Sequence, residues 1–175
     1  ETNSSFANDN EEEYVLSDNK ITAIFDKIKG ELCSFGEGEN LLQSGPLLNV
    51  WRAPTDNDGI KLWSERPEES WKVLSYWKSL GLNKMQYRLK SIRLIINVGQ
   101  PASIMITHQG TGRGRWNDFT HIHRYTLLPT GILWVTNQVR VGNGIYDLPR
   151  IGITLCLNPG FENVEWFGRG PWENY

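Results

Sequence analysis

Short apolar runs separated by turn residues extend along most of the chain. Five runs come first, at residues 14–16, 20–26, 31–35, 41–43 and 47–51, and six follow, at residues 86–98, 102–109, 119–128, 132–141, 151–157 and 164–168. Glycine, proline, asparagine and aspartate gather between the runs, as in the connections of antiparallel sheets. Ile21, Ala23 and Phe25 alternate with their neighbours in the way typical of a half-buried strand. The pattern predicts an all-β sandwich of antiparallel strands.

The run at residues 86–98 is longer than the others and changes its phase partway along. Tyr87 and Leu89 occupy odd positions, whereas Ile92 and Leu94 occupy even ones. A shift of this kind is the sign of one extra residue in a strand. We therefore expect a β-bulge near Ser91.

One segment has helical rather than strand spacing, between Glu65 and Leu80. Pro67 and the glutamates after it suit a first helical turn, and Gly81 suits the C-terminal cap. The apolar residues recur every three positions, at Trp71, Leu74, Trp77 and Leu80. This pattern predicts one short helix lying on a sheet.

Composition limits the domain count and the partners. The chain has 175 residues and a formal charge of -2. Residues 1–11 are polar and without periodicity, which predicts a disordered lead-in, so that the sandwich domain occupies residues 12–175. Only Arg113 and Arg115 form a basic run, which argues against binding to nucleic acid or to an acidic membrane surface. No apolar run is long enough to span a membrane.

The ends of the chain and its cysteines suggest little chemistry. The chain begins at Glu1 and shows no apolar signal segment, so we expect a mature chain or an excised piece of a longer one. Cys33 and Cys156 are too far apart in sequence for a metal knuckle or a local redox pair. We expect both to be buried free thiols.

Aromatic residues are abundant, with eight Trp, six Tyr and six Phe. A Trp face can stack on the C–H face of a sugar ring, which favours carbohydrate binding. Packing in the core of a sandwich is the alternative.

Three histidines fall on neighbouring predicted strands. His121 and His123 share a face, and His108 on the preceding strand could join them as a zinc ligand. The alternative is that they face solvent or form hydrogen bonds on a sheet face, because no carboxylate or Cys accompanies them. The nearby run Gly110 to Gly114 has a predicted strand after it rather than a helix, which predicts a hairpin connection instead of a phosphate loop.

Hydrolysis of a glycosidic bond would need two facing carboxylates. The sequence offers several acidic candidates: Asp56, Asp58, Glu65, Asp118, Glu165 and Glu173. Asp56 and Asp58 belong to a segment, Arg52 to Gly59, that is rich in turn residues. Their side chains could build the turn, or contact sugar hydroxyls or a metal.

Three segments resemble a known family. Leu47-Leu-Asn-Val-Trp-Arg-Ala-Pro-Thr-Asp-Asn-Asp-Gly59, Pro149-Arg-Ile-Gly-Ile153 and Phe167-Gly-Arg-Gly-Pro-Trp-Glu-Asn-Tyr175 are similar to the small-chain domain of glycoside hydrolase family 2 β-galactosidases. The resemblance covers residues 12–175 and about two thirds of that domain. It implies a galactose-mutarotase-like super-sandwich, C-terminally incomplete, in an enzyme whose catalytic glutamates lie in a preceding (β/α)-barrel.

The resemblance also implies which residues matter. No catalytic residue falls in this segment, and neither does a metal or cofactor site, although the full-length enzyme is expected to use divalent and monovalent cations. The substrate-loop candidates are Asp56, Asn57, Asp58, Trp63 and Glu65, and the motif residues expected to be structural are Trp51, Arg52, Pro54, Gly168, Gly170, Pro171, Glu173, Asn174 and Tyr175. The implied partners are a β-galactoside sugar, the catalytic barrel of the same polypeptide and further copies in a homo-oligomer. Bacterial cytoplasm and periplasm are both compatible with these features.

Two other functions stay open at this stage. A free-standing carbohydrate-binding module would use exposed Trp side chains and no catalytic group. An aldose epimerase would need a His acid with a Glu base, for instance His121 or His123 with Glu165. If the sandwich is incomplete, its uncovered edge should expose Trp166, Phe167 and their neighbours and favour self-association.

Overall fold

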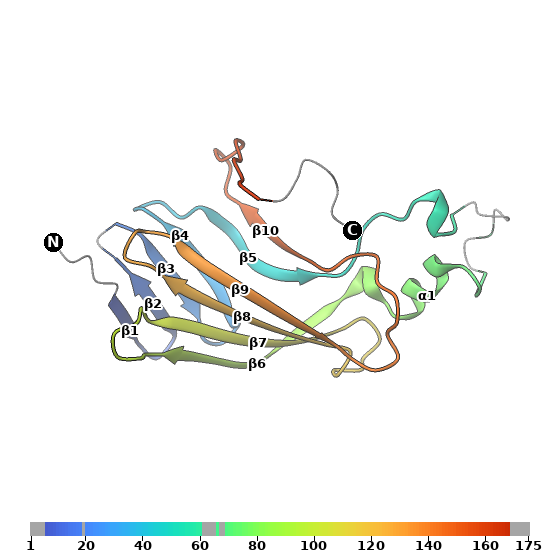
Figure 1. Cartoon of the computed structure of the whole chain (residues 1–175), viewed down its shortest axis with the longest axis horizontal. Coiled ribbons are helices and arrows are strands. Elements are labelled where there is room, and N and C mark those ends of the chain that lie inside the picture. Colours follow the sequence, from blue (N-terminus) through green and yellow to red (C-terminus); the bar gives the residue numbers. More distant parts are fainter. Residues whose placement is uncertain (1–5, 19, 61–65, 67–68, 169–175) are drawn as a thin grey trace.

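The computed structural model describes residues 6–18, 20–60, 66 and 69–168 of the chain (Figure 1). The strands are β1 (Phe6–Asp9), β2 (Glu13–Ser17), β3 (Thr22–Asp26), β4 (Glu31–Gly36), β5 (Leu42–Asn49), β6 (Gln86–Ile95), β7 (Ser103–Thr111), β8 (Phe119–Leu127), β9 (Leu133–Val141) and β10 (Gly152–Leu157). The helical elements are α1 (Val73–Ser79) and two 3₁₀ turns, η1 (Asp56–Asp58) and η2 (Leu82–Lys84).

The strands form three antiparallel sheets within these ranges. Two sheets have four strands each in sequence order, β1 to β4 and β6 to β9, and the third pairs β10 with β5. This arrangement confirms the predicted all-β sandwich. The expected bulge is also confirmed, because the register of β6 against β7 shifts between Leu89 and Ser91. As expected, residues 112–118 connect β7 and β8 as a hairpin.

The main core lies between the two four-stranded sheets. Phe25 of β3 meets Tyr125 of β8 with ring centroids 5.1 Å apart, and both residues are fully buried. The rest of this core comes from both sheets and β5: Leu16, Ala23, Leu32, Leu42, Ile104, Ile106 and Leu127. The alternation along β8, in which every second residue is buried, puts this apolar set on one face. Burial of that face holds the two sheets together.

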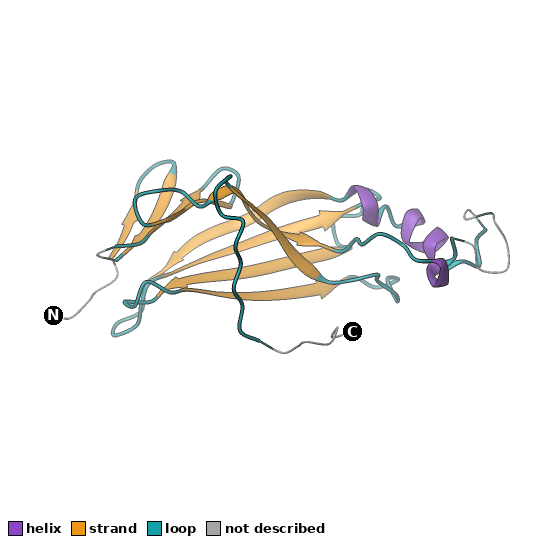
Figure 2. Ribbon diagram, turned by 90° about the horizontal axis from the view of Figure 1, so that it is seen from above, coloured by secondary structure: helices purple, strands orange, loops and turns teal. Residues whose placement is uncertain are grey.

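A second core forms around α1 at one end of the sandwich, away from β1 (Figures 1 and 2). Leu74, Trp77 and Leu80 pack there against Leu48, Val50, Leu82 and Phe119. The helix is shorter than the predicted segment 65–80 and covers the ends of β5 and β8. The prediction that Trp71 belongs to the apolar stripe of the helix is wrong, because this residue lies before the helix and is 55% exposed. Gly81 follows the helix with φ 69°, as expected for a C-terminal cap.

Several other predictions need correction. The predicted disorder of residues 1–11 is wrong for residues 6–9, because they pair in register with β2 and form β1. Residues 1–5 lie outside the described range. Residues 164–168 form no strand. Cys33 and Cys156 are free but exposed, because each lies on an uncovered strand face.

The predicted runs 41–43 and 47–51 merge into the single strand β5. Pro46 lacks an N–H and would interrupt regular pairing. The register of β10 against β5 shifts between Thr154 and Cys156, opposite this residue. The bulge lets the strand continue past Pro46.

One side of the sandwich is open between β9 and the β5–β10 pair. An apolar groove of about 460 Å³ runs there, lined among others by Leu32, Leu42, Val135 and Leu155. β9 ends its sheet in the described residues, and Trp134 and Val135 are 59% and 38% exposed. Trp166 and Phe167 are also exposed, as expected from the sequence.

We expect the 175-residue chain to self-associate through this side, because an unpaired strand edge beside an apolar groove recruits other strands. Light scattering at increasing concentration should show growth in mass. The variant Val135→Lys should reduce it, whereas Ile28→Lys, the same change at an exposed turn position, should not. A strictly monomeric chain with a cooperative melt would show instead that the chain closes its own core.

Candidate functional site

The substrate loop predicted from the sequence leaves β5 at the helical end of the molecule. Asn49 ends the strand: its Nδ2 donates to Thr154 Oγ1 of β10 at 3.0 Å, and its Oδ1 accepts the N–H of Trp51 at 2.8 Å. The Trp51 ring then meets Trp77 of α1 edge to face, with centroids 6.3 Å apart. The loop therefore starts from a point fixed by both the sheet and the helix.

Arg52 organises the segment that follows. Its guanidinium binds both oxygens of Asp58, at 2.6 and 2.9 Å, and its Nε donates to the Pro149 carbonyl oxygen at 3.1 Å. The guanidinium carbon also lies 5.3 Å from the centroid of the Trp77 ring, a cation–π arrangement. Arg52 thus joins two of the segments that resemble the same family, at residues 47–59 and 149–153.

Asp58 closes the loop on itself. Besides Arg52, its Oδ2 accepts the Thr55 N–H at 2.6 Å and the Thr55 hydroxyl at 3.0 Å. The Arg52 guanidinium, with the two Thr55 donors, holds the pKa of the Asp58 carboxyl below its usual range, and the same pair raises the pKa of Arg52. The carboxylate therefore serves as a turn-building acceptor.

Gly59 fixes the far end of the loop. It has φ 108°, a conformation that side chains rarely adopt, and a Cβ built there would lie 2.8 Å from Cβ of Lys72. Lys72 is the buried residue that precedes α1. The loop is thus held from within by Arg52 and Asp58, and from outside by contact with the start of the helix.

Asp56 and Asn57 differ from their neighbours in the loop. Both are exposed at the tip of η1, and neither side chain makes a hydrogen bond or ion pair within the described part of the chain. Trp63 and Glu65, the other two candidates, lie outside the described residues. A contact between this loop and a sugar stays a prediction.

The remaining motif residues also fall partly inside and partly outside the described part of the chain. Trp51 and Arg52 are half-buried in the contacts given above, and Pro54 is half-buried beside them. Gly168 is exposed at the end of the described chain. Gly170, Pro171, Glu173, Asn174 and Tyr175 lie outside it.

Two of the acidic candidates are neutralised by arginines. Asp118 is buried, with Arg113 donating to both of its oxygens at 2.8 and 2.9 Å and Thr111 Oγ1 donating at 3.1 Å. Asp58 is paired in the same manner with Arg52. Both carboxylates are therefore already engaged by donors of the protein itself. Glu165 is exposed in the segment after β10.

The histidines form a buried chain of hydrogen bonds across the inner face of the sheet. His108 Nε2 lies 3.4 Å from the Lys29 carbonyl oxygen, His108 Nδ1 lies 3.0 Å from His123 Nε2, and His123 Nδ1 lies 2.8 Å from the Tyr125 hydroxyl. A carbonyl can only accept, so Nε2 of His108 carries the proton and its Nδ1 accepts from His123. Burial lowers the pKa of both rings and favours their neutral forms, and with neutral rings it is Tyr125 that donates to His123.

His121 stands beside this chain, with its ring stacked on His123 at a centroid distance of 4.2 Å. Its Nε2 donates to Asn137 Oδ1 at 2.8 Å, and its Nδ1 is buried without a hydrogen-bond partner. Burial lowers the pKa of all three histidines, that of His123 to about 2, and the neighbouring rings add to the effect on His121 and His123.

The expectation of hydrogen-bonded histidines is therefore confirmed. The alternative that they face solvent is wrong, because His108 on β7 and the odd-numbered residues of β8 are buried. No group of three or more His, Cys, Asp or Glu side chains in the described ranges is arranged to hold a metal ion. His121 and His123 are each 1% exposed, which leaves them out of reach of a sugar and gives the epimerase pair with Glu165 no support.

Sequence reasoning missed two features at this end. It did not connect Arg52 with Pro149 and Trp77, which lie far along the chain. It also missed an aromatic pair, Tyr76 and Tyr146, whose rings stack with centroids 4.2 Å apart. Spacing within one element could have revealed neither.

Comparison with known proteins gives a consistent match. The sequence model of a family described as beta galactosidase small chain matches residues 17–175. A β-galactosidase of Priestia megaterium is 30% identical over 168 residues, which cover 95% of this chain and 15% of that protein. β-Galactosidases of Vibrio cholerae and of an Arthrobacter species are 29% and 28% identical, covering 86% and 75% of this chain and 15% and 14% of those proteins. The chain thus spans about 15% of the length of the curated relatives it matches. No helix in the described ranges is long and apolar enough to cross a membrane.

The variant Asp58→Ala should lower the free energy of unfolding by about 1 to 3 kcal/mol, because it leaves a half-buried guanidinium and the Thr55 N–H without their acceptor. Urea unfolding measures the loss, and Asp56→Ala is the matched control, with an expected change within about 0.5 kcal/mol. If Asp58→Ala kept its melting temperature and the full-length enzyme lost activity a thousandfold, Asp58 would be a substrate contact instead.

The free energy of unfolding should fall as the pH drops below about 6.5, the ordinary pKa of His. The unfolded chain then takes up protons that the folded chain, with its lowered His pKa values, does not bind. Each such histidine adds a slope of about 1.4 kcal/mol per pH unit, whereas above about pH 7.5 all are neutral in both states and the contribution is constant. Urea unfolding at several pH values measures the slope.

All three histidines of the chain belong to this cluster, so no surface His contributes to the same pH window. His121→Leu is the informative variant, because it removes one group that takes up a proton on unfolding. Its only lost hydrogen bond among the described residues is the one to the exposed Asn137. This variant should reduce the slope, by at most about 1.4 kcal/mol per pH unit. An unfolding free energy that does not change between about pH 7.5 and about pH 5.5 would contradict the buried neutral cluster.

Proposed function

Because the chain belongs to the β-galactosidase small-chain family, we propose that it is the non-catalytic sandwich domain of an enzyme that hydrolyses terminal β-D-galactosides. In this proposal the domain packs on the catalytic barrel of the same polypeptide and shapes the mouth of the active site. The observation that carries the proposal is the loop from Arg52 to Gly59, which is fixed at both ends and exposes Asp56 and Asn57 at its tip.

The chemistry of the described residues supports a positional role. Glycoside hydrolysis needs one carboxylic acid that protonates the leaving oxygen and a second carboxylate across the sugar. Asp58 and Asp118, two of the acidic candidates, are each bound by an arginine. Asp56 can instead accept hydrogen bonds from sugar hydroxyls, and Asn57 can both accept and donate them. Because the loop is rigid, little conformational entropy is lost when these bonds form. The expected cations and the homo-oligomer would belong to the full-length enzyme.

A carbohydrate-binding module is the second candidate. Trp71, Trp134 and Trp166 are 55%, 59% and 82% exposed, which is the feature that such a module would use. Micromolar binding of galactose or lactose by the 175-residue chain alone, followed by Trp fluorescence, would favour this function over the first.

In the full-length enzyme, replacing Asp56 and Asn57 together by Ala should raise the KM for lactose about tenfold, equivalent to about 1.4 kcal/mol, while the melting temperature stays unchanged. Glu37→Ala, at another exposed turn position, is the control and should change neither value.

The purified 175-residue chain should not hydrolyse a nitrophenyl β-galactoside above the uncatalysed rate.

Two results would contradict the proposal. The first is turnover by the 175-residue chain that Glu165→Gln or Glu173→Gln abolishes, since the segment would then carry its own catalytic carboxylate. The second is a full-length protein that hydrolyses no β-galactoside.

A further inference from the structure

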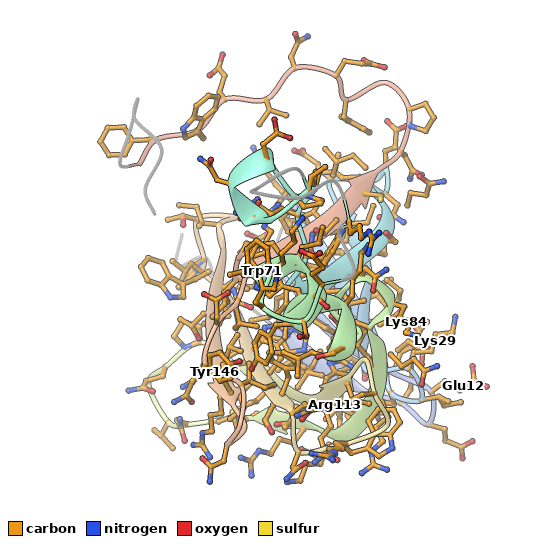
Figure 3. All side chains as sticks on the ribbon, turned by 90° about the vertical axis from the view of Figure 1, so that its right-hand side faces the viewer. Glu12, Lys29, Trp71, Lys84, Arg113 and Tyr146 are labelled. Atoms are coloured by element: carbon orange, nitrogen blue, oxygen red, sulfur yellow. The ribbon has the colours of Figure 1, made fainter. Side chains whose placement is uncertain are left out.

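A second surface at the helical end has the features of a ligand site. The residues before and within α1, together with the connection between β9 and β10, enclose a pocket of about 170 Å³ whose lining includes Trp71, Tyr76, Tyr146 and Asp147. Figure 3 shows Trp71 and Tyr146 on the end of the molecule that faces the viewer. We call these four residues the aromatic corner.

Tyr146 presents a fixed aromatic face to solvent. One side of its ring stacks on Tyr76, at an interplanar angle of 21°, yet the residue is 81% exposed. The Tyr76 hydroxyl donates to the Gly144 carbonyl oxygen at 3.0 Å and accepts the Tyr146 N–H at 3.2 Å. These bonds hold the connection between β9 and β10 against α1. The outer face of Tyr146 is therefore ordered before any ligand arrives, which reduces the entropy lost on binding.

Asp147 supplies a polar group that lines the same pocket as Tyr146. The indole N–H of buried Trp77 donates to Asp147 Oδ2 at 2.6 Å and fixes the direction of the carboxylate. Oδ1 makes no hydrogen bond among the described residues, and the side chain is exposed. A second large ring, that of Trp71, is 55% exposed on the helix side of the same pocket.

We propose that the aromatic corner is a saccharide subsite that binds one galactoside unit, with the sugar ring stacked on Tyr146 and a hydroxyl donating to Asp147 Oδ1. One face of a galactose ring exposes a patch of C–H groups that matches an aromatic face, and its hydroxyls match a carboxylate acceptor. A pocket of this size admits one ring rather than a long chain. The choice of galactose over other hexoses rests on the proposed function.

The corner lies beside the substrate loop without sharing its residues. Trp77 connects the two, because it donates to Asp147 and carries the Arg52 guanidinium over its ring. The alternative is that another domain of the full-length protein covers the corner. That case is one of the outcomes of the following test.

The test counts binding sites in the full-length protein with an S-linked galactoside, which resists hydrolysis, by isothermal titration calorimetry. We expect two sites per chain, one in the catalytic centre and one in the aromatic corner. Tyr146→Ala should leave one site, whereas Tyr146→Phe, which keeps the ring, should leave two. Asp147→Asn still accepts the Trp77 N–H and should weaken the second site about tenfold. Ile28→Ala, at another apolar side chain that is 81% exposed, is the matched control and should keep both sites.

One site per chain in the unmodified protein, or two sites in Tyr146→Ala, would overturn the inference. Hydrolysis of a nitrophenyl β-galactoside by the same preparation separates this result from the proposed function. An enzyme that hydrolyses but binds a single galactoside refutes only the subsite. A protein that loses a galactoside site on Tyr146→Ala but shows no hydrolysis supports the subsite and refutes the proposed function.

Discussion

The ion pair between Arg52 and Asp58 is the contact on which the helical end of the molecule depends. Through Arg52 the loop is joined to the carbonyl of Pro149, which precedes β10, and to the ring of Trp77 in α1. Three segments that are distant in sequence therefore share one cation. Because the pair lowers the pKa of Asp58 and raises that of Arg52, it stays ionised at ordinary pH. The loop takes its position from this pair, and Trp77, which carries the Arg52 guanidinium over its ring, also fixes Asp147 of the aromatic corner.

The buried histidines and Asp118 form their hydrogen bonds and ion pairs with other groups of the protein. His108 and His123 are hydrogen-bonded to each other, to Tyr125 and to a main-chain carbonyl, and His121 donates to Asn137 and stacks on His123. Burial lowers the pKa of all three and favours their neutral forms. Asp118 is held by Arg113. Asp56, Asn57 and Asp147 differ from these groups in being exposed. This distribution is compatible with the positional role proposed above.

Sequence patterns predicted the strands well because each strand carries its own period. The phase change in residues 86–98 even located the bulge at Leu89 to Ser91. The helix was predicted too long, because Lys72 has an extended backbone and the helix begins only at Val73. The exposure of Cys33 and Cys156 depends on which strand faces stay uncovered, and the histidine chain depends on pairing between β7 and β8. At the site, the turn-building role of Asp58 could be considered from residue types alone, but its partner Arg52 required the fold.

The close fit of Gly59 against Lys72 has a consequence for how the loop can change over evolutionary time. A side chain at Gly59 would collide with the helix start, and a change at Arg52 or Asp58 would break the ion pair, so these positions tolerate few substitutions. Asp56 and Asn57 carry no such constraint. Natural variation can enter at those two positions without disturbing the surrounding backbone. The loop thus combines a constrained scaffold with a small tip at which substitutions leave the backbone undisturbed.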